Sequence, residues 1–337
     1  MKSARPIISS ASCSSRARLR RITVGVLIAG CTSQAETIHD GSCIAPANPG
    51  GGWDLTCRAA AQTLSTLAPR EPKLRVMNVP GDGGMIAFAR VVNEMRGSEG
   101  VIVAASPSTL LGIAQSHGGS LTESDVRWLA AVGTEKSVVA VGVDSPWHTL
   151  KEFVDAWKAD PEAITIGGSS AVGGGDHMKM LLLARAAGID VSQVRYLPLS
   201  SALEAIRSLR AGTIQVYPGD VSKLLRQAER KELRVIGILG DTRASGVLAD
   251  VPTAREQGYD VVFTIWRGLY APPGISDAAY RKWVERLNAM QQSPEWRALL
   301  AQNGLTPFYK GGPDFEKFVT EQAAAYRAIL RDIGMAH

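Results

Sequence analysis

Three glycine-rich segments are the part of this sequence best suited to binding chemistry. The first, at residues 49–54, reads Pro-Gly-Gly-Gly-Trp-Asp; the second, at residues 78–84, reads Asn-Val-Pro-Gly-Asp-Gly-Gly; the third spans residues 167–177. Glycine lets the backbone approach a ligand closely. A helix that begins after such a loop directs free N–H groups and a partial positive charge at the ligand. The loops therefore predict a site for a carboxylate.

The same segments do not match nucleotide-binding or catalytic motifs. In the second loop, Ile86 stands where the dinucleotide fingerprint needs its third glycine, and no Gly-Lys-Ser/Thr follows as in a P-loop. Neither Ser169 nor Ser170 has the Gly-x-Ser-x-Gly frame of a nucleophile elbow. The five histidines lack metal-ligand spacing. We expect no cofactor, metal or catalytic residue, and His177 to be structural or ligand-contacting rather than a catalytic base.

Strand and helix patterns alternate from residue 42 onward and position these loops. The first unit has expected strands at 43–47, 74–78 and 101–105 and helices at 54–67, 85–95 and 107–115. A second unit with the same rhythm runs from residue 150 to residue 239. This βαβ rhythm predicts parallel sheets covered on both faces, with the ligand at the carboxyl ends of the strands.

Two strand-like segments, 138–143 and 261–270, lie at the ends of the second unit. We interpret them as crossover strands between two domains, which returns the three C-terminal helices to the first domain. The predicted fold class is α/β, the two-lobed type II periplasmic binding protein fold, with two crossover strands forming the hinge. The expected domains are 36–140 plus 262–337 and 141–261. Two tandem domains are the alternative, but they leave the C-terminal helices without a sheet.

Residues 1–35 have the features of a signal peptide. A basic stretch at 16–21 precedes an apolar run at 22–30, which is shorter than the roughly 20 residues that span a bilayer. Ser33-Gln34-Ala35 suits cleavage before Glu36, whereas Ile28-Ala29-Gly30-Cys31 resembles a lipobox. We expect a soluble periplasmic product, with a lipoprotein anchored at Cys31 as the alternative.

Charge and cysteine usage agree with export. Six of the 37 basic residues lie in the first 21 positions, so the chain without residues 1–35 has 31 basic and 32 acidic residues. A nucleic-acid partner is not expected, because such proteins carry a basic face. Cys43 and Cys57 remain after the leader; an oxidising compartment permits a disulfide between them, but we favour two buried free thiols.

The order of these motifs resembles the tripartite tricarboxylate transporter substrate-binding proteins. The segment from Ile44 through residue 54, with Arg58 after it, is similar to the opening of that family. Residues 78–84 match its second loop, usually Asn-x-Pro-Gly-x-Gly-Gly. Further agreement lies at residues 212–220, 233–235, 250–253, 256–258, 266–268 and 271–274. The resemblance covers nearly all of the chain after residue 40.

The resemblance implies an extracytoplasmic solute-binding protein that closes on a small carboxylate and delivers it to membrane permease subunits. In this family, backbone N–H groups and ordered waters hold a carboxylate between the first two loops. This places Gly51, Gly52, Gly83 and Gly84 at the proximal carboxylate. The full set implied to bind the ligand is Gly51, Gly52, Trp53, Asp54, Gly83, Gly84, Ser106, Ser170, Gly173, His177, Asp220 and Arg267.

Trp53 and the Trp266-Arg267-Gly268 run resemble the tricarboxylate-binding branch, which predicts a ligand such as citrate. Arg267 is either the counter-charge of the ligand, able to form a bidentate pair, or half of an interlobe salt bridge.

Three acidic residues depart from this expectation. Asp54, Asp82 and Asp220 would repel a carboxylate unless they point away from it, and otherwise favour an ammonium-bearing or hydroxylated ligand or bound water. Asp54 has a second interpretation as a helix cap.

Two other functions fit the predicted fold. A ligand-sensing periplasmic partner of a membrane kinase would share the fold and the cleft and differ in its docking partner. A secreted hydrolase would need an activated group, which the motifs do not supply. We therefore expect a receptor rather than an enzyme, and the resemblance to the family implies a monomer.

Overall fold

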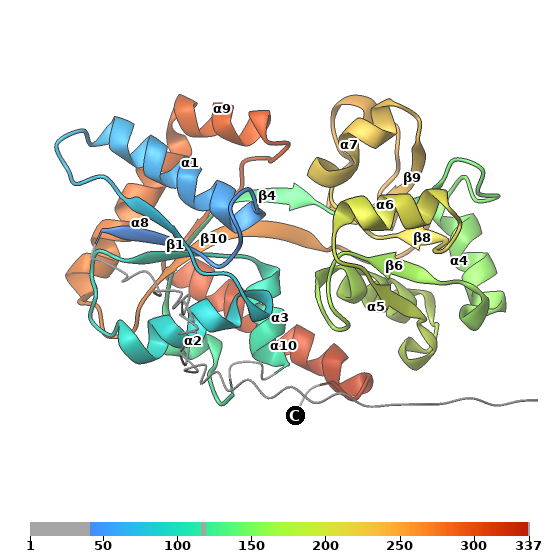
Figure 1. Cartoon of the computed structure of the whole chain (residues 1–337), viewed down its shortest axis with the longest axis horizontal. Helices are drawn as coiled ribbons and strands as arrows, with labels where there is room; N and C mark the ends of the chain where they lie inside the picture. The colour runs from blue at the N-terminus through green and yellow to red at the C-terminus, as the bar shows by residue number, and fades with distance from the viewer. Residues whose placement is uncertain (1–40, 116–118, 336–337) are drawn as a thin grey trace, which may run out of the picture. The chain divides into compact units, whose positions relative to one another are not determined.

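The computed structural model describes residues 41–115 and 119–335; the predicted signal peptide lies outside them. Six strands form the first sheet: β1 (Ser42–Ala45), β2 (Arg75–Asn78), β3 (Ile102–Ala105), β4 (Arg127–Lys136), β10 (Thr264–Ala271) and β11 (Lys310–Gly311). Their order across the sheet is β11-β4-β10-β3-β1-β2 (Figure 1). In the described part of the chain, no helix combines the length and apolarity needed to cross a membrane.

Helices cover both faces of the first sheet, as its alternating side chains require. Cys43 and Ala45 of β1 pack with one group of helices, whereas Ile44 packs with the other. The first group is α1 (Gly52–Leu67), α8 (Asp277–Gln292) and α9 (Pro294–Gln302). The second group is α2 (Met85–Glu94), α3 (Pro107–Ala114) and α10 (Pro313–Asp332).

The second sheet is built in the same way from the middle of the chain. Its strands are β5 (Val138–Gly142), β6 (Ile166–Gly168), β7 (Tyr196–Pro198), β8 (Val216–Tyr217) and β9 (Leu233–Ile238), in the order β7-β6-β8-β5-β9. Its helices are α4 (Leu150–Ala159), α5 (Gly175–Ala187), α6 (Ala202–Arg210) and α7 (Val221–Glu229). The first two pack on one face, and α6 and α7 pack on the other.

The expectation of parallel sheets was wrong for the strands that connect the sheets. The pairs β1–β2, β1–β3, β6–β7 and β6–β8 are parallel. By contrast, β10 runs antiparallel to β3 and β4, and β5 runs antiparallel to β8 and β9. Each reversed strand arrives from the other sheet, because β4 leads into β5 and β9 leads towards β10. The two connections therefore join the carboxyl edges of the sheets, where the first and third glycine loops also lie.

The chain first passes from one sheet to the other slightly before the expected segment 138–143. Segment 138–143 corresponds to β5, which pairs only within the second sheet, whereas the long strand β4 before it was not predicted. Ser137 alone separates these two strands, and Lys136 pairs with Thr264 at the start of β10. Figure 1 shows β4 and β10 running side by side towards the second sheet. We propose that the chain changes lobes at Ser137 and Phe263, and we name the parts built on the two sheets the first and second lobes.

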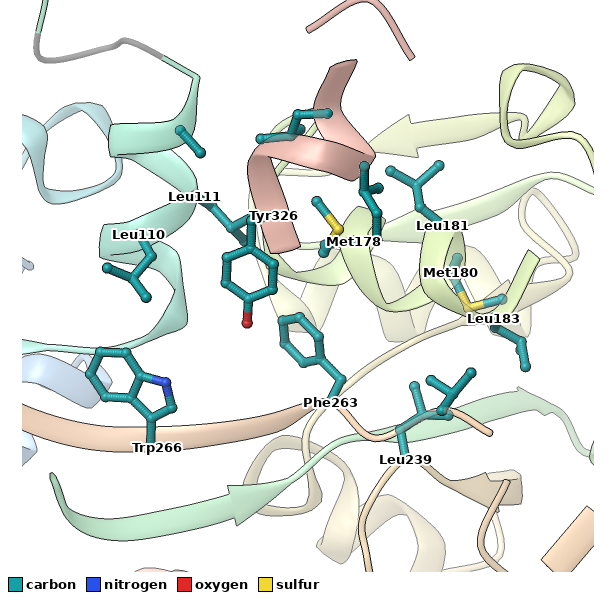
Figure 2. Close-up of a cluster of buried hydrophobic side chains, with 14 of the residues drawn as sticks. Leu110, Leu111, Met178, Met180, Leu181, Leu183, Leu239, Phe263, Trp266 and Tyr326 are labelled. Carbon is teal, nitrogen blue, oxygen red and sulfur yellow. The ribbon is translucent and has the colours of Figure 1, made fainter. Parts of the chain in front are cut away.

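One hydrophobic cluster continues across the two lobes. Leu111 of α3 and Tyr326 of α10 lie beside Phe263, with Met178 of α5 beyond (Figure 2). The rings of Phe263 and Tyr326 have centroids 6.1 Å apart. Gln115 supports this contact, since its Nε2 donates to the carbonyl oxygen of Gly173 at 3.2 Å. The lobes are therefore packed together on the side formed by α3, α10 and α5.

The prediction of free thiols was wrong, because Cys43 and Cys57 form a disulfide with their Cα atoms 5.6 Å apart. Both residues are fully buried. Helix α1 packs on the face of the sheet that carries Cys43, so the buried side of the helix brings Cys57 to it. The bond fastens the strand before the first glycine loop to the helix after it.

Candidate ligand-binding site

A cavity of about 210 Å³ lies where the carboxyl edges of the two sheets face each other. The residues that line it follow β1, β3, β6 and β8, or belong to β10 and its approach. We name the first-lobe side, formed by Gly52, Trp53, Ser106, Ser108 and Arg267, the first wall. The second wall consists of Ser169, Ser170, Gly175, Asp176, Lys179, Asp220 and Lys223.

The start of α1 presents backbone donors on the first wall. Its N-cap is Gly51, which has no capping side chain, and within the described residues the N–H groups of Gly52 and Trp53 have no hydrogen-bond partner. A Cβ atom at Gly52 would lie 2.5 Å from Nη1 of Arg267. The absence of a side chain at Gly52 lets the guanidinium group lie directly over the start of the helix, and a larger residue would have to displace it.

The start of α3 completes the first wall. Ser106 caps this helix by accepting a hydrogen bond from the N–H of Ser108 at 3.3 Å, and Pro107 occupies the first helical position. The same Ser106 oxygen accepts a hydrogen bond from Nε1 of Trp53 at 3.1 Å. Trp53 thus links the starts of α1 and α3, and the hydroxyl proton of Ser106 stays available to a ligand.

The loop before α5 is closed by reciprocal bonds on the second wall. Oγ of Ser170 accepts from the N–H of Asp176 at 3.0 Å. Oδ2 of Asp176 in turn accepts from the N–H and the hydroxyl of Ser169, at 2.8 and 2.9 Å. The loop is therefore held in one conformation, and Gly175 faces Ser108 of the first wall, whose Oγ would lie 3.7 Å from a Cβ atom.

Ion pairs continue from Asp176 across the second wall. Nζ of Lys179 lies 2.7 Å from Asp176 and 2.6 Å from Asp220, and Asp220 also pairs with Lys223 at 2.7 Å. Burial alone would raise the pKa of Asp220, but the charges of Lys179 and Lys223 outweigh it and hold that pKa well below its usual range. The group is therefore ionised at neutral pH.

Arg267 has a protein counter-ion. Its Nη2 donates to Oε2 of Glu135 at 2.7 Å, and Oε1 of the same carboxylate accepts from the N–H of Ser222 at 2.9 Å. Glu135 is fully buried near the end of β4 and thereby connects β10 with the start of α7. Arg267 lines the cavity, and its ion pair with Glu135 lies within the first lobe, because β4 and β10 belong to the same sheet. The predicted salt bridge between the lobes is therefore not formed; the contact with the second lobe is the hydrogen bond from the N–H of Ser222 to Glu135.

The model of the tripartite tricarboxylate transporter family receptor matches residues 74–335. The chain belongs to this family. A UPF0065 protein of Bordetella pertussis is 23% identical over 321 residues, which cover 94% of this chain and 97% of that protein. The family and the fold are those of extracytoplasmic solute-binding receptors, which are not enzymes.

Solved structures share the receptor fold. MatC of Rhodopseudomonas palustris, solved with bound malate, superposes with a TM-score of 0.69 at 18% identity, covering 86% of this chain and 98% of its own. A second R. palustris protein, solved with adipate, superposes with a TM-score of 0.72 at 19% identity, covering 88% and 97%.

Asp54 of the receptor stabilises the loops without lining the cavity. Its Oδ2 accepts from Nε of Arg58 at 2.9 Å and from the N–H of Gly50 at 2.8 Å, and its Oδ1 accepts from Nδ2 of Asn78 at 2.9 Å. The bond from Arg58, with those from Gly50 and Asn78, lowers the pKa of Asp54 to about 2 despite its burial. The helix-cap interpretation was wrong, because α1 begins at Gly52 and Asp54 lies within its first turn.

The second glycine loop approaches the ring of Trp53 through Gly84. A Cβ atom at Gly84 would lie 3.1 Å from the Trp53 ring, whereas one at Gly83 would meet no atom within 4 Å. Asp82 and Gly83 are exposed. Neither Gly83, Gly84 nor Gly51 is among the residues that line the cavity.

A hydrogen bond between Gly173 and His177 stabilises the third glycine loop. Nδ1 of His177 accepts from the N–H of Gly173 at 2.9 Å, and its ring stacks on Tyr196 with centroids 4.4 Å apart. Burial lowers the pKa of His177 to about 4, so the imidazole is neutral at physiological pH. Neither residue lines the cavity.

The structure therefore brings together half of the set implied by the family resemblance. The members that line the cavity are Gly52, Trp53, Ser106, Ser170, Asp220 and Arg267. Sequence reasoning missed Asp176, Lys179 and Lys223. A usable signal existed for Lys179, the one charged residue in the otherwise apolar stretch 178–183. No comparable signal marks Lys223, because exposed lysines are common on helices.

Proposed function

We propose that this receptor captures a small carboxylate in the cavity between its lobes and delivers it to the permease of a tripartite tricarboxylate transporter. The supporting observation is that the starts of α1, α3, α5 and α7 meet at one cavity that Arg267 and Lys223 also line. Each helix start contributes a partial positive charge, which favours an anion, and the start of α1 adds the N–H groups of Gly52 and Trp53.

The size of the cavity favours a small ligand. Its volume of about 210 Å³ is below the roughly 300–1,000 Å³ of sites for drug-sized molecules. The related structures that hold malate and adipate support the same class of ligand. Citrate, expected from the resemblance of Trp53 and residues 266–268, stays a prediction.

An ammonium-bearing ligand is not favoured. Asp220 lines the cavity, but Lys179 and Lys223 occupy its two carboxylate oxygens. Asp176 is likewise occupied by Lys179 and Ser169. Because a buried ammonium group needs a free acceptor, a carboxylic acid without an amino group fits this cavity better than an amino acid.

A thermal-shift screen of the purified protein with mono-, di- and tricarboxylates and amino acids tests this function, with calorimetry for each hit. A ligand at 100 times its dissociation constant adds about 2.7 kcal/mol to stability, which raises the unfolding midpoint by several degrees. Stabilisation by carboxylic acids alone is the expected result. If no carboxylic acid raises the midpoint, the proposed function is wrong.

Experiments in cells distinguish a role in transport from a role in sensing. Loss of uptake of the bound acid in a strain lacking the receptor supports delivery to a permease. Unchanged uptake with a lost transcriptional response would favour the sensor for a membrane kinase.

We also propose that residues 1–35 direct export and that the receptor is a periplasmic monomer. Mass spectrometry of the protein from the periplasm distinguishes a chain that starts at Glu36 from one lipidated at Cys31. Light scattering checks the monomer.

A further inference from the structure

Two aspartates and two lysines form a continuous row of ion pairs along the second wall of the cavity. Lys179 joins Asp176 to Asp220, and Asp220 joins Lys179 to Lys223. Asp176, Lys179 and Asp220 are each at most 3% exposed, whereas the side chain of Lys223 is 40% exposed. The members of this row therefore differ in how far a ligand can reach them.

Lys179 has no hydrogen-bonding capacity left for a ligand. An ammonium group donates three hydrogen bonds. Nζ of Lys179 has four acceptors within 3.2 Å: Oδ1 of Asp176, Oδ1 of Asp220, and the carbonyl oxygens of Pro218 and Gly219. Lys179 therefore holds the two carboxylates in place and does not itself contact the ligand.

Lys223 is the member of the row that can bind an anion. In the described chain its Nζ has one protein partner, Oδ2 of Asp220, which leaves two of its three N–H groups for a ligand. It lies in the first turn of α7 and lines the cavity. The ion pair with Asp220 fixes where the ammonium group lies.

The first wall offers a second, separate set of donors. The N–H groups of Gly52 and Trp53 point from the start of α1, and Nη1 of Arg267 lies over that start. The cavity thus has unused donors on both walls.

We propose that the ligand is a dicarboxylate, that its first carboxylate lies against the start of α1 and Arg267, and that Lys223 binds its second carboxylate. This inference rests on the proposed function and adds the residue that selects for a second negative charge.

The charge of the cavity disfavours a third carboxylate. Its three cationic side chains, Lys179, Lys223 and Arg267, are already paired with Asp176, Asp220 and Glu135. A third ligand carboxylate would lie near these acidic groups without a cation of its own.

Calorimetry with succinate, adipate, butyrate and citrate tests the assignment on the wild type and three variants. Lys223→Met removes the ammonium group and keeps a side chain of similar length, and Lys223→Arg keeps the positive charge. Arg230→Met removes an exposed positive charge from the other end of α7 and is the matched control. Thermal midpoints of all variants check that they fold.

We expect Lys223→Met to weaken the best dicarboxylate by about 10- to 100-fold, the range for a hydrogen bond to a charged group. Butyrate affinity should change less than about threefold, because it uses only the first wall. Lys223→Arg should retain most of the affinity, and Arg230→Met should match the wild type.

Two results would overturn the assignment while leaving the proposed function intact. The first is that the wild type binds dicarboxylates and Lys223→Met either leaves their affinity unchanged or lowers it by the same factor as the affinity for butyrate. The other is citrate binding more tightly than every dicarboxylate. If the wild type binds none of these four acids and no other carboxylic acid raises its thermal midpoint, the proposed function itself is wrong.

Discussion

The two walls of the cavity present positive charge by different means. The first wall uses the open start of α1, a glycine that admits Arg267, and the cap of α3. The second wall uses ionised side chains, held by a buried lysine between two aspartates. Backbone donors suit any carboxylate, whereas a placed side chain distinguishes one acid from another. We infer that the first wall supplies general affinity and the second supplies selectivity.

The largest expected effect is on the second wall. Lys179→Met leaves Asp176 and Asp220 buried without their shared cation, so the free energy of unfolding should fall by about 3–5 kcal/mol. Urea titration measures it. Lys151→Met is the control, because its pair with Asp155 is exposed and contributes less than about 1 kcal/mol. Equal losses in both variants would show that the ion row does not stabilise the second wall.

The first wall depends on a covalent bond instead. Replacing both Cys43 and Cys57 by Ala removes a disulfide with a sequence separation of 14, for which chain entropy predicts a loss of about 3 kcal/mol. The midpoint of thermal unfolding checks this. A reducing agent should lower the midpoint of the wild type and leave the double variant unchanged. An unchanged midpoint in the double variant would contradict the role of the bond.

Binding by the first wall should depend on Gly52. A Cβ atom there displaces Arg267, so Gly52→Ala should weaken all carboxylates alike, by about tenfold. Gly142→Ala is the control, since its Cβ atom would make only an ordinary contact at 3.5 Å. Calorimetry with mono- and dicarboxylates measures both.

A further variant shows which of the first two glycine loops binds the carboxylate. Gly83→Val tests the second loop, where the family resemblance places the proximal carboxylate. If Gly83→Val abolishes binding and Gly52→Ala does not, the carboxylate lies at the second loop and not at the first wall.

The smallest effect concerns acid stability near the first wall. The pKa of Asp54 is lowered to about 2 in the folded state, from about 3.9 in an unfolded chain. Its stabilising contribution is therefore present above about pH 4 and is lost as the pH falls towards 2. Asp54→Asn should flatten this part of the profile of unfolding midpoint against pH, and the exposed Asp260→Asn should not. Parallel profiles for wild type and Asp54→Asn would contradict the assignment.

Local sequence patterns predicted most of the helices and strands in their order along the chain, with β4 as an exception. The expected helices at 54–67 and 85–95 nearly coincide with α1 and α2, because apolar spacing and the glycines before each helix are local signals. Strand β4 was missed although it contains the apolar run 128–132, since an apolar run of that length does not distinguish a strand from a buried helix. The direction of each strand could not be predicted from the sequence, because it depends on whether the chain reaches that strand from the same sheet or from the other one.

For the site, the sequence identified features that are contiguous in the chain but not the contacts between residues far apart in it. The glycines at 50–52 and the family motifs around them are contiguous in the chain, so the sequence alone identified the receptor family and predicted a carboxylate-binding loop. The disulfide, the pairing of Arg267 with Glu135 and the row through Lys179 join residues 14, 132 and 41 positions apart. Only the packed structure could decide these, because burial and distance, which set the charge state and the availability of each group, arise from the fold as a whole.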